Sequence, residues 1–125
     1  MDLRPDHIGI VVSGLERAKA FYRALGFVDG NERIMADKTL SFMRLGALEV
    51  ELFAYNESVP APDLPERVLG FKHLALETQD IDAAFLELRE AGTISEDIAI
   101  REMPDGWRLL FFPDPDGMEI EVKQA

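Results

Sequence analysis

The chain has 125 residues, of which 47% are hydrophobic and 30% charged, and this length and composition predict one globular domain. Its 13 Lys and Arg residues against 24 Asp and Glu residues give a formal net charge of −11, which disfavours nucleic acid and anionic membranes as partners. No cysteine is present, so disulfides, thiolate metal sites and thiol nucleophiles are excluded. The N-terminal apolar run is too short for a secretory leader or a membrane span, and we expect a cytoplasmic location.

The first half of the chain begins with a pattern typical of a strand followed by a helix. The segment from His7 to Val12 predicts a strand, and apolar residues at helical spacing then predict a helix that ends at Gly26. Ser13 and Glu16 have the spacing of a capping box at the start of this helix. Three further strands are expected, at 28–34, 39–45 and 48–52.

The second half repeats this order. His73 begins a strand, Asp80 is a plausible N-cap, and the helix that follows ends at Gly92. His7 and Gly26 are 19 positions apart, as are His73 and Gly92, which indicates an internal repeat. Strands are again expected to follow the helix, at 98–103, 107–112 and 118–122.

A linker separates the two halves. Prolines at positions 60, 62 and 65 interrupt a stretch without hydrophobic periodicity. We therefore expect a single domain over 1–125, with one βαβββ module at about 1–57, a linker at 58–69 and a second module at about 70–125. The fold class is predicted to be α+β.

Alternation along four strands separates an apolar face from a polar one. The apolar face, which would pack on the helices, includes Ile8, Val50, Leu74 and Ile120. The polar face holds every residue with evident chemistry: His7, Glu49, Glu51, His73, Glu119 and Glu121.

The two histidines of the chain occupy equivalent positions of the repeat. A single strand histidine is more often a structural residue, but a repeated His and Glu set has no such explanation. Two imidazoles and two carboxylates suit a divalent Zn, Ni, Co, Mn or Fe ion. Spacing alone does not choose between Glu49 and Glu51, or between Glu119 and Glu121, because both members of each pair share one face.

The chain resembles the vicinal oxygen chelate superfamily, the glyoxalase I, bleomycin-resistance and extradiol dioxygenase group. The resemblance covers nearly the whole sequence and rests on DHIGIVVSGLERAKAFYRALGF, ALEVELF, GFKHLALETQDIDAAFLELREAG and RLLFFPDPDGMEIEV. It implies paired βαβββ modules whose strands form a U-shaped mixed sheet around a metal site.

The glyoxalase I-like branch implies a set of four metal ligands, one His and one Glu from each module. Matched by position, these would be His7, Glu51, His73 and Glu121, with one divalent metal ion per site. The implied activity is that of a lyase or isomerase acting on a small carbonyl or hemithioacetal substrate through a metal-stabilised ene-diolate. Glu121 would be the general base, with Glu51 as the symmetric alternative.

Two positions depart from the glutathione-using glyoxalases. Those enzymes commonly carry Arg four positions after the first His and Asn four positions after the first Glu, where this chain has Val11 and Tyr55. Asn56 lies one position later, and Arg108 is an attractive cation for an anionic group of the substrate. We therefore take Tyr55, Asn56 and Arg108 as candidate substrate-binding residues, and the departures at Val11 and Tyr55 argue against glutathione recognition.

Three other functions compete with the lyase. Extradiol ring cleavage uses two His and one Glu in this superfamily, which would leave one carboxylate redundant. Acyl-thioester epimerases resemble this chain but have Gln at the position of Glu51. A metal-free ligand-sequestering protein of the bleomycin-resistance type would not need the four ligands. The resemblance also implies a small-molecule substrate and a homodimer.

Overall fold

The structure is a computed structural model that describes residues 1–125. The chain divides into two compact units, Met1–Pro60 and Ala61–Ala125, and each is described by itself. No helix is both long and apolar enough to cross a bilayer.

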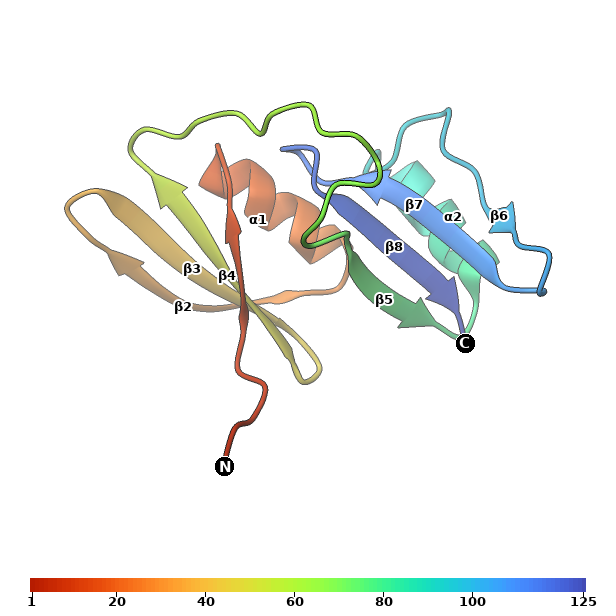
Figure 1. Ribbon diagram of the computed structural model, residues 1–125, viewed down its shortest axis with the longest axis horizontal. Coiled ribbons are helices and arrows are strands. Elements are labelled where there is room, and N and C mark those ends of the chain that lie inside the picture. Colours follow the sequence, from red (N-terminus) through yellow and green to blue (C-terminus); the bar gives the residue numbers. More distant parts are fainter. The chain divides into compact units, whose positions relative to one another are not determined.

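The first unit contains one helix and a four-stranded mixed sheet (Figure 1). Its elements are β1 (Ile8–Val11), α1 (Leu15–Ala24), β2 (Val28–Ile34), β3 (Lys38–Leu45) and β4 (Leu48–Tyr55). The strand order is β1-β4-β3-β2. Because β1 and β4 are parallel neighbours, the first and last strands of the unit lie side by side.

The second unit has the same architecture. Its elements are β5 (Leu74–Thr78), α2 (Ile81–Glu90), β6 (Arg101–Glu102), β7 (Arg108–Pro113) and β8 (Glu119–Gln124). The strand order is β5-β8-β7-β6, and β5 runs parallel to β8. The α+β class and the two βαβββ modules are therefore confirmed.

One strand is shorter than the sequence pattern predicts. We expected it over 98–103, but β6 has only the two residues Arg101–Glu102. The guanidinium of Arg89 donates hydrogen bonds to the backbone carbonyls of Glu96 at 3.2 Å and Ile98 at 3.0 Å. These carbonyls are bound to a side chain, so the segment before β6 forms a loop against α2 instead of extending the sheet.

The two helices begin differently. The capping box predicted at Ser13 is displaced, because the N-cap of α1 is Gly14, and the Ser13 hydroxyl accepts a hydrogen bond from Arg17 at 2.8 Å. In α2 the prediction is confirmed, since Asp80 is the N-cap and its Oδ1 accepts the N–H of Ala83 at 3.0 Å. This bond satisfies one of the free donors of the first turn.

Both helices end where the glycines predict. Gly26 and Gly92 follow the helices with φ angles of 100° and 72°. This left-handed backbone is strained for residues with a Cβ, so a glycine at these positions stops each helix at low cost.

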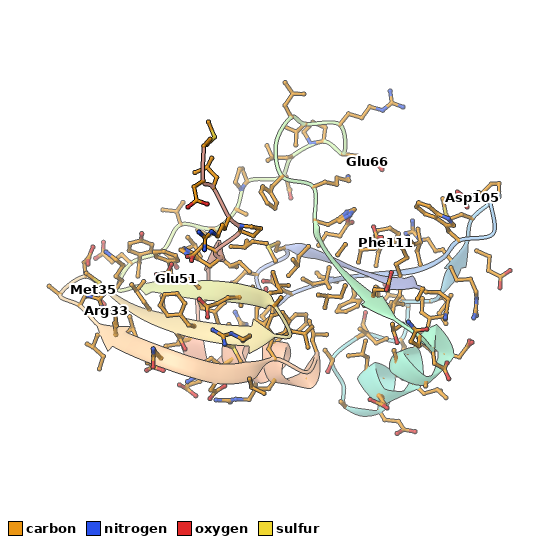
Figure 2. All side chains as sticks on the ribbon, turned by 90° about the horizontal axis from the view of Figure 1, so that it is seen from below. Arg33, Met35, Glu51, Glu66, Asp105 and Phe111 are labelled. Carbon is orange, nitrogen blue, oxygen red and sulfur yellow. The ribbon has the colours of Figure 1, made fainter.

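Each sheet buries one face beneath its own helix. In the first unit Val50 and Leu52 are fully buried with Tyr22 of α1, and in the second unit Leu110 and Ile120 are fully buried with Ile81 of α2. Figure 2 shows that Glu51 and Phe111 lie on the sheet faces opposite α1 and α2. The polar faces predicted from strand alternation are thus the faces that the helices leave uncovered.

Candidate functional site

In the first unit, His7 and Glu51 form a close pair. His7 directly precedes β1, and Glu51 lies in β4, where its Cα partner is Gly9. The distance from His7 Nε2 to Glu51 Oε2 is 2.7 Å, and Glu51 is only 7% exposed. The parallel pairing of β1 and β4 therefore brings together two predicted metal ligands that are 44 positions apart in the sequence.

The other ring nitrogen of His7 also faces a carboxylate. Asp6 Oδ2 lies 2.5 Å from His7 Nδ1. This hydrogen bond is the largest cause of a raised pKa at His7, and the negative charge of Glu51 adds to it. Asp6 was not among the predicted site residues, although it directly precedes His7 in the sequence.

The second unit contains the equivalent pair. His73 directly precedes β5, and its Nε2 lies 2.9 Å from Glu121 Oε2 on β8. Its Nδ1 lies 3.2 Å from Glu119 Oε1. The ring of Phe111, from β7, is 5.9 Å from the imidazole between centroids. Each histidine therefore has carboxylates at both ring nitrogens.

A tight turn sets the position of Glu119 and Glu121. Asp114 Oδ1 accepts the N–H groups of Asp116 at 2.9 Å and Met118 at 2.8 Å, and Asp114 is 4% exposed. Gly117 has a φ of 92°, which completes the turn before β8. The DPDG sequence thus reverses the chain and starts β8 in the register that directs both carboxylates to the His73 side.

The arrangement around each histidine fits a metal ligand. An imidazole whose Nδ1–H donates to a carboxylate presents the lone pair of Nε2, and this carboxylate–histidine pattern commonly supports a bound metal. In both units Nε2 faces a second carboxylate at 2.7 or 2.9 Å. An imidazole nitrogen and a carboxylate oxygen are both donor types that a divalent ion such as Zn²⁺ accepts, so each facing pair could supply two ligands to one ion.

Each unit supplies only half of a four-ligand set. Neither unit contains by itself three or more side chains arranged to hold a metal ion. Each unit by itself therefore brings together only two of the four predicted ligands.

The flanking acids differ between the units. Glu119 contacts His73 Nδ1, whereas Glu49 is 2.9 Å from Arg44 Nη2 and leaves the Nδ1 position of His7 to Asp6. Within each Glu pair, Glu51 and Glu121 are the carboxylates that face Nε2.

The predicted substrate contact of Arg108 is not favoured by its position. Arg108 and Phe111 differ by an odd number of positions in β7 and so project to opposite faces. Its guanidinium forms two bonds with the carboxylate of Asp82 in α2, at 2.7 and 2.9 Å. Arg108 therefore ties β7 to the helix, away from His73.

This ion pair should make stability depend on acid pH. The hydrogen bonds from Arg108 hold the pKa of Asp82 below its ordinary value of 3.8. Because the folded pKa is lowered, the stabilisation is present above about pH 4 and lost as the pH falls through the folded pKa. We expect Asp82→Asn to reduce the free energy of unfolding at pH 7 and to lose this difference in strong acid, as measured by urea denaturation. Asp63→Asn, in the linker, is the control and should behave as wild type at both pH values; a difference independent of pH would contradict the assignment.

Tyr55 and Asn56 have different surroundings. Tyr55 shares the polar face with Glu51 and stacks on Phe53, with ring centroids 6.2 Å apart. Asn56 Nδ2 donates to the carbonyl of Ala36 at 3.0 Å, and the Asn56 backbone N–H donates to the carbonyl of Asp37 at 2.9 Å. Asn56 thus fastens the loop between β2 and β3, while the ring of Tyr55 lies against Phe53 and has Lys38 Nζ 5.4 Å from its centroid.

The strand register places two cations, Arg101 and Lys123, on the His73 face, and neither was among the predicted substrate-binding residues. Arg101 is the Cα partner of Leu109, and Lys123 is the partner of the same residue from the other side. The face of Arg101 could not be predicted from sequence spacing, because it depends on how β6 pairs with β7.

Comparison with known proteins identifies relatives over the whole length. The model of the Glyoxalase/Bleomycin resistance protein/Dioxygenase superfamily matches residues 4–122. The uncharacterized protein YwkD of Bacillus subtilis (strain 168) is 34% identical, covering 93% of this chain and 92% of YwkD. The solved structure of a glyoxalase family protein from Enterococcus faecalis is 30% identical, with a TM-score of 0.81 and 97% of each chain covered.

Two more distant proteins have named activities. Human mitochondrial methylmalonyl-CoA epimerase is 27% identical, covering 98% of this chain and 74% of the epimerase. Lactoylglutathione lyase from Agrobacterium tumefaciens is 22% identical with a TM-score of 0.69, covering 98% of this chain and 93% of the lyase, and it shows a shared fold. The family match and the 34% identity lead to one conclusion: the chain belongs to the Glyoxalase/Bleomycin resistance protein/Dioxygenase superfamily.

Proposed function

We propose that the protein is a divalent-metal-dependent lyase or isomerase of the glyoxalase I type, acting on a small carbonyl or hemithioacetal compound. The observation that carries this proposal is the repeated pair in which a histidine Nε2 faces a glutamate Oε2, at 2.7 Å in the first unit and 2.9 Å in the second. A binding protein without a metal gives no reason for this pair to occur in both modules.

His7, Glu51, His73 and Glu121 would hold the ion, which would be Zn, Ni, Co, Mn or Fe. When bound, the metal would supply a Lewis acid for negative charge that develops on the oxygens of the substrate. Asp6 and Glu119, which lie 2.5 and 3.2 Å from Nδ1 of their histidines, would orient the imidazoles by accepting the Nδ1 proton.

The proton transfer is assigned to a carboxylate. Glu121 would take the proton from the carbon next to the carbonyl group and return it to the neighbouring carbon. Glu51 is the symmetric alternative, since the two side chains are similarly shielded, at 13% and 10% exposure.

The first test is the metal content of the protein, purified without an affinity tag and measured by elemental analysis. We expect about one ion per chain, one for each four-ligand set, and its loss in both His73→Ala and Glu121→Ala. Glu77→Ala is the matched control, because Glu77 lies on the same sheet face and takes no part in the pair. A native protein that takes up no Zn²⁺, Ni²⁺, Mn²⁺ or Fe²⁺ would refute the proposal and favour a ligand-sequestering protein.

An acyl-thioester epimerase is the second candidate, and the similarity to methylmalonyl-CoA epimerase over 98% of the chain favours it. Both reactions begin with removal of a proton next to a carbonyl. Exchange of that proton with D₂O in an acyl thioester, without exchange or turnover of a hemithioacetal, would identify the epimerase.

We also propose a homodimer. Each unit holds two of the four ligands, so two chains offer a second way to complete a site. Light scattering would give the mass of two 14.1 kDa chains if the dimer forms.

A further inference from the structure

Three side chains form a row across the sheet of the second unit, on the face of His73 and Glu121. Arg101 of β6 pairs with Leu109 of β7, and Leu109 pairs with Lys123 of β8. Residues paired in this way project to the same side of a sheet. With strands about 4.8 Å apart, the two cationic side chains flank Leu109 from backbones roughly 10 Å apart.

Both cations lie on aromatic rings and not on carboxylates. The guanidinium carbon of Arg101 is 5.3 Å from the centroid of the Phe111 ring, and Lys123 Nζ is 4.3 Å from that of Trp107. Neither has a carboxylate within ion-pair distance, whereas Arg108, on the opposite face, is paired with Asp82. In a chain with 24 acidic residues, two positive charges without an ion-pair partner on one face are available to an external anion.

Stacking leaves the donors of these cations accessible. A guanidinium that lies over a ring keeps its N–H groups at its edge, where they suit a carboxylate or a phosphate. Glu77 is the Cα partner of Lys123 on the side away from Leu109, so no acidic residue lies in the row between Lys123 and Arg101.

The row is close to the proposed chemistry. Glu121 pairs with Phe111 in the next row, two residues along the strand from Lys123, which corresponds to about 7 Å. A small molecule can therefore place an anionic group on the row while its reacting carbon lies near Glu121.

We propose that Arg101 and Lys123 bind an anionic group, a carboxylate or a phosphate, of the substrate. The inference rests on the proposed function and narrows it to carbonyl compounds that carry a negative charge. Arg101 and Lys123 thus take the role that was predicted for Arg108 from the sequence.

The only tryptophan of the chain, Trp107, lies against Lys123 and reports on this site. We would titrate the untagged protein with sodium phosphate and with sodium malonate, at constant ionic strength held with NaCl, and record tryptophan fluorescence. We expect a saturable change with at least one probe, and the probe that binds distinguishes phosphate from carboxylate. Arg101→Gln should weaken the binding by about tenfold or more, because a charge-assisted hydrogen bond is lost.

Arg33→Gln is the matched control, since Arg33 is an exposed cation of β2 with no ion-pair partner; it should bind as wild type. Lys123→Gln, measured by the shift of the Trp107 indole N–H resonance, is the second variant and should also weaken binding. A response that does not saturate, or that is equal in Arg101→Gln and wild type, would overturn the inference.

Repeating the titration after metal removal with EDTA separates the two proposals. Anion binding that survives EDTA and depends on Arg101 supports the cation pair, even if the elemental analysis finds no metal. Binding that is abolished by EDTA and unaffected by Arg101→Gln would mean that the anion binds the metal, and would refute the cation pair while leaving the metal site intact.

Discussion

Glu51→Gln should lower the affinity for Zn²⁺ by more than about 100-fold, whereas Glu49→Gln should change it by less than about threefold. The two residues share one face of β4, but Glu51 Oε2 is 2.7 Å from His7 Nε2, and Glu49 is paired with Arg44. Loss of a partner that only orients a ligand typically costs 10- to 100-fold, and loss of a ligand costs more. Competition with a chromophoric chelator would measure both affinities.

Glu119→Gln extends this comparison to the second unit. Because Glu119 contacts His73 Nδ1 at 3.2 Å and does not face Nε2, we expect an intermediate loss of Zn²⁺ affinity, of about 10- to 100-fold.

Equal losses of Zn²⁺ affinity in Glu49→Gln and Glu51→Gln would show that the polar face acts only through its total charge. That result would contradict the assignment of Glu51 as a ligand.

Phe112→Ala should reduce the free energy of unfolding by about 3–5 kcal/mol. Phe112 is 2% exposed on the helix-covered face of β7, and its removal leaves a cavity in the core. The neighbouring Phe111 is the matched control, since it projects to the polar face and is only half-buried. Urea denaturation of the two variants should therefore show a clearly smaller loss for Phe111→Ala.

Phe111→Ala and Phe112→Ala also distinguish an effect on stability from an effect on anion binding. Phe111 contacts the imidazole of His73 and the guanidinium of Arg101, so Phe111→Ala should weaken the binding of phosphate or malonate more than Phe112→Ala does. Similar stability losses in the two variants would contradict the burial of one face of β7 and the openness of the other.

Much of the fold follows from patterns that are local in the sequence. The alternation of Ile8, Val50 and Ile120 with polar neighbours predicts which face of each strand is buried, because side chains alternate along any strand. Gly26 and Gly92 predict the helix ends because a left-handed residue is required there. The strand predicted over 98–103 forms only at Arg101–Glu102. The guanidinium of Arg89, in α2, binds the carbonyl of Ile98, and this contact could not be predicted from local sequence.

The candidate site was likewise predictable from the sequence only in part. The sequence by itself determined the repeat, the two histidines at its equivalent positions and the four acids on their side of the strands, since repetition and parity are properties of the chain. Only the tertiary structure decided that Glu51 and Glu121 face Nε2, that Asp6 and Glu119 take Nδ1, and that Arg101 and not Arg108 lies on the His73 face. These choices depend on which strands pair and in which register, and register is set by packing between residues far apart in the sequence.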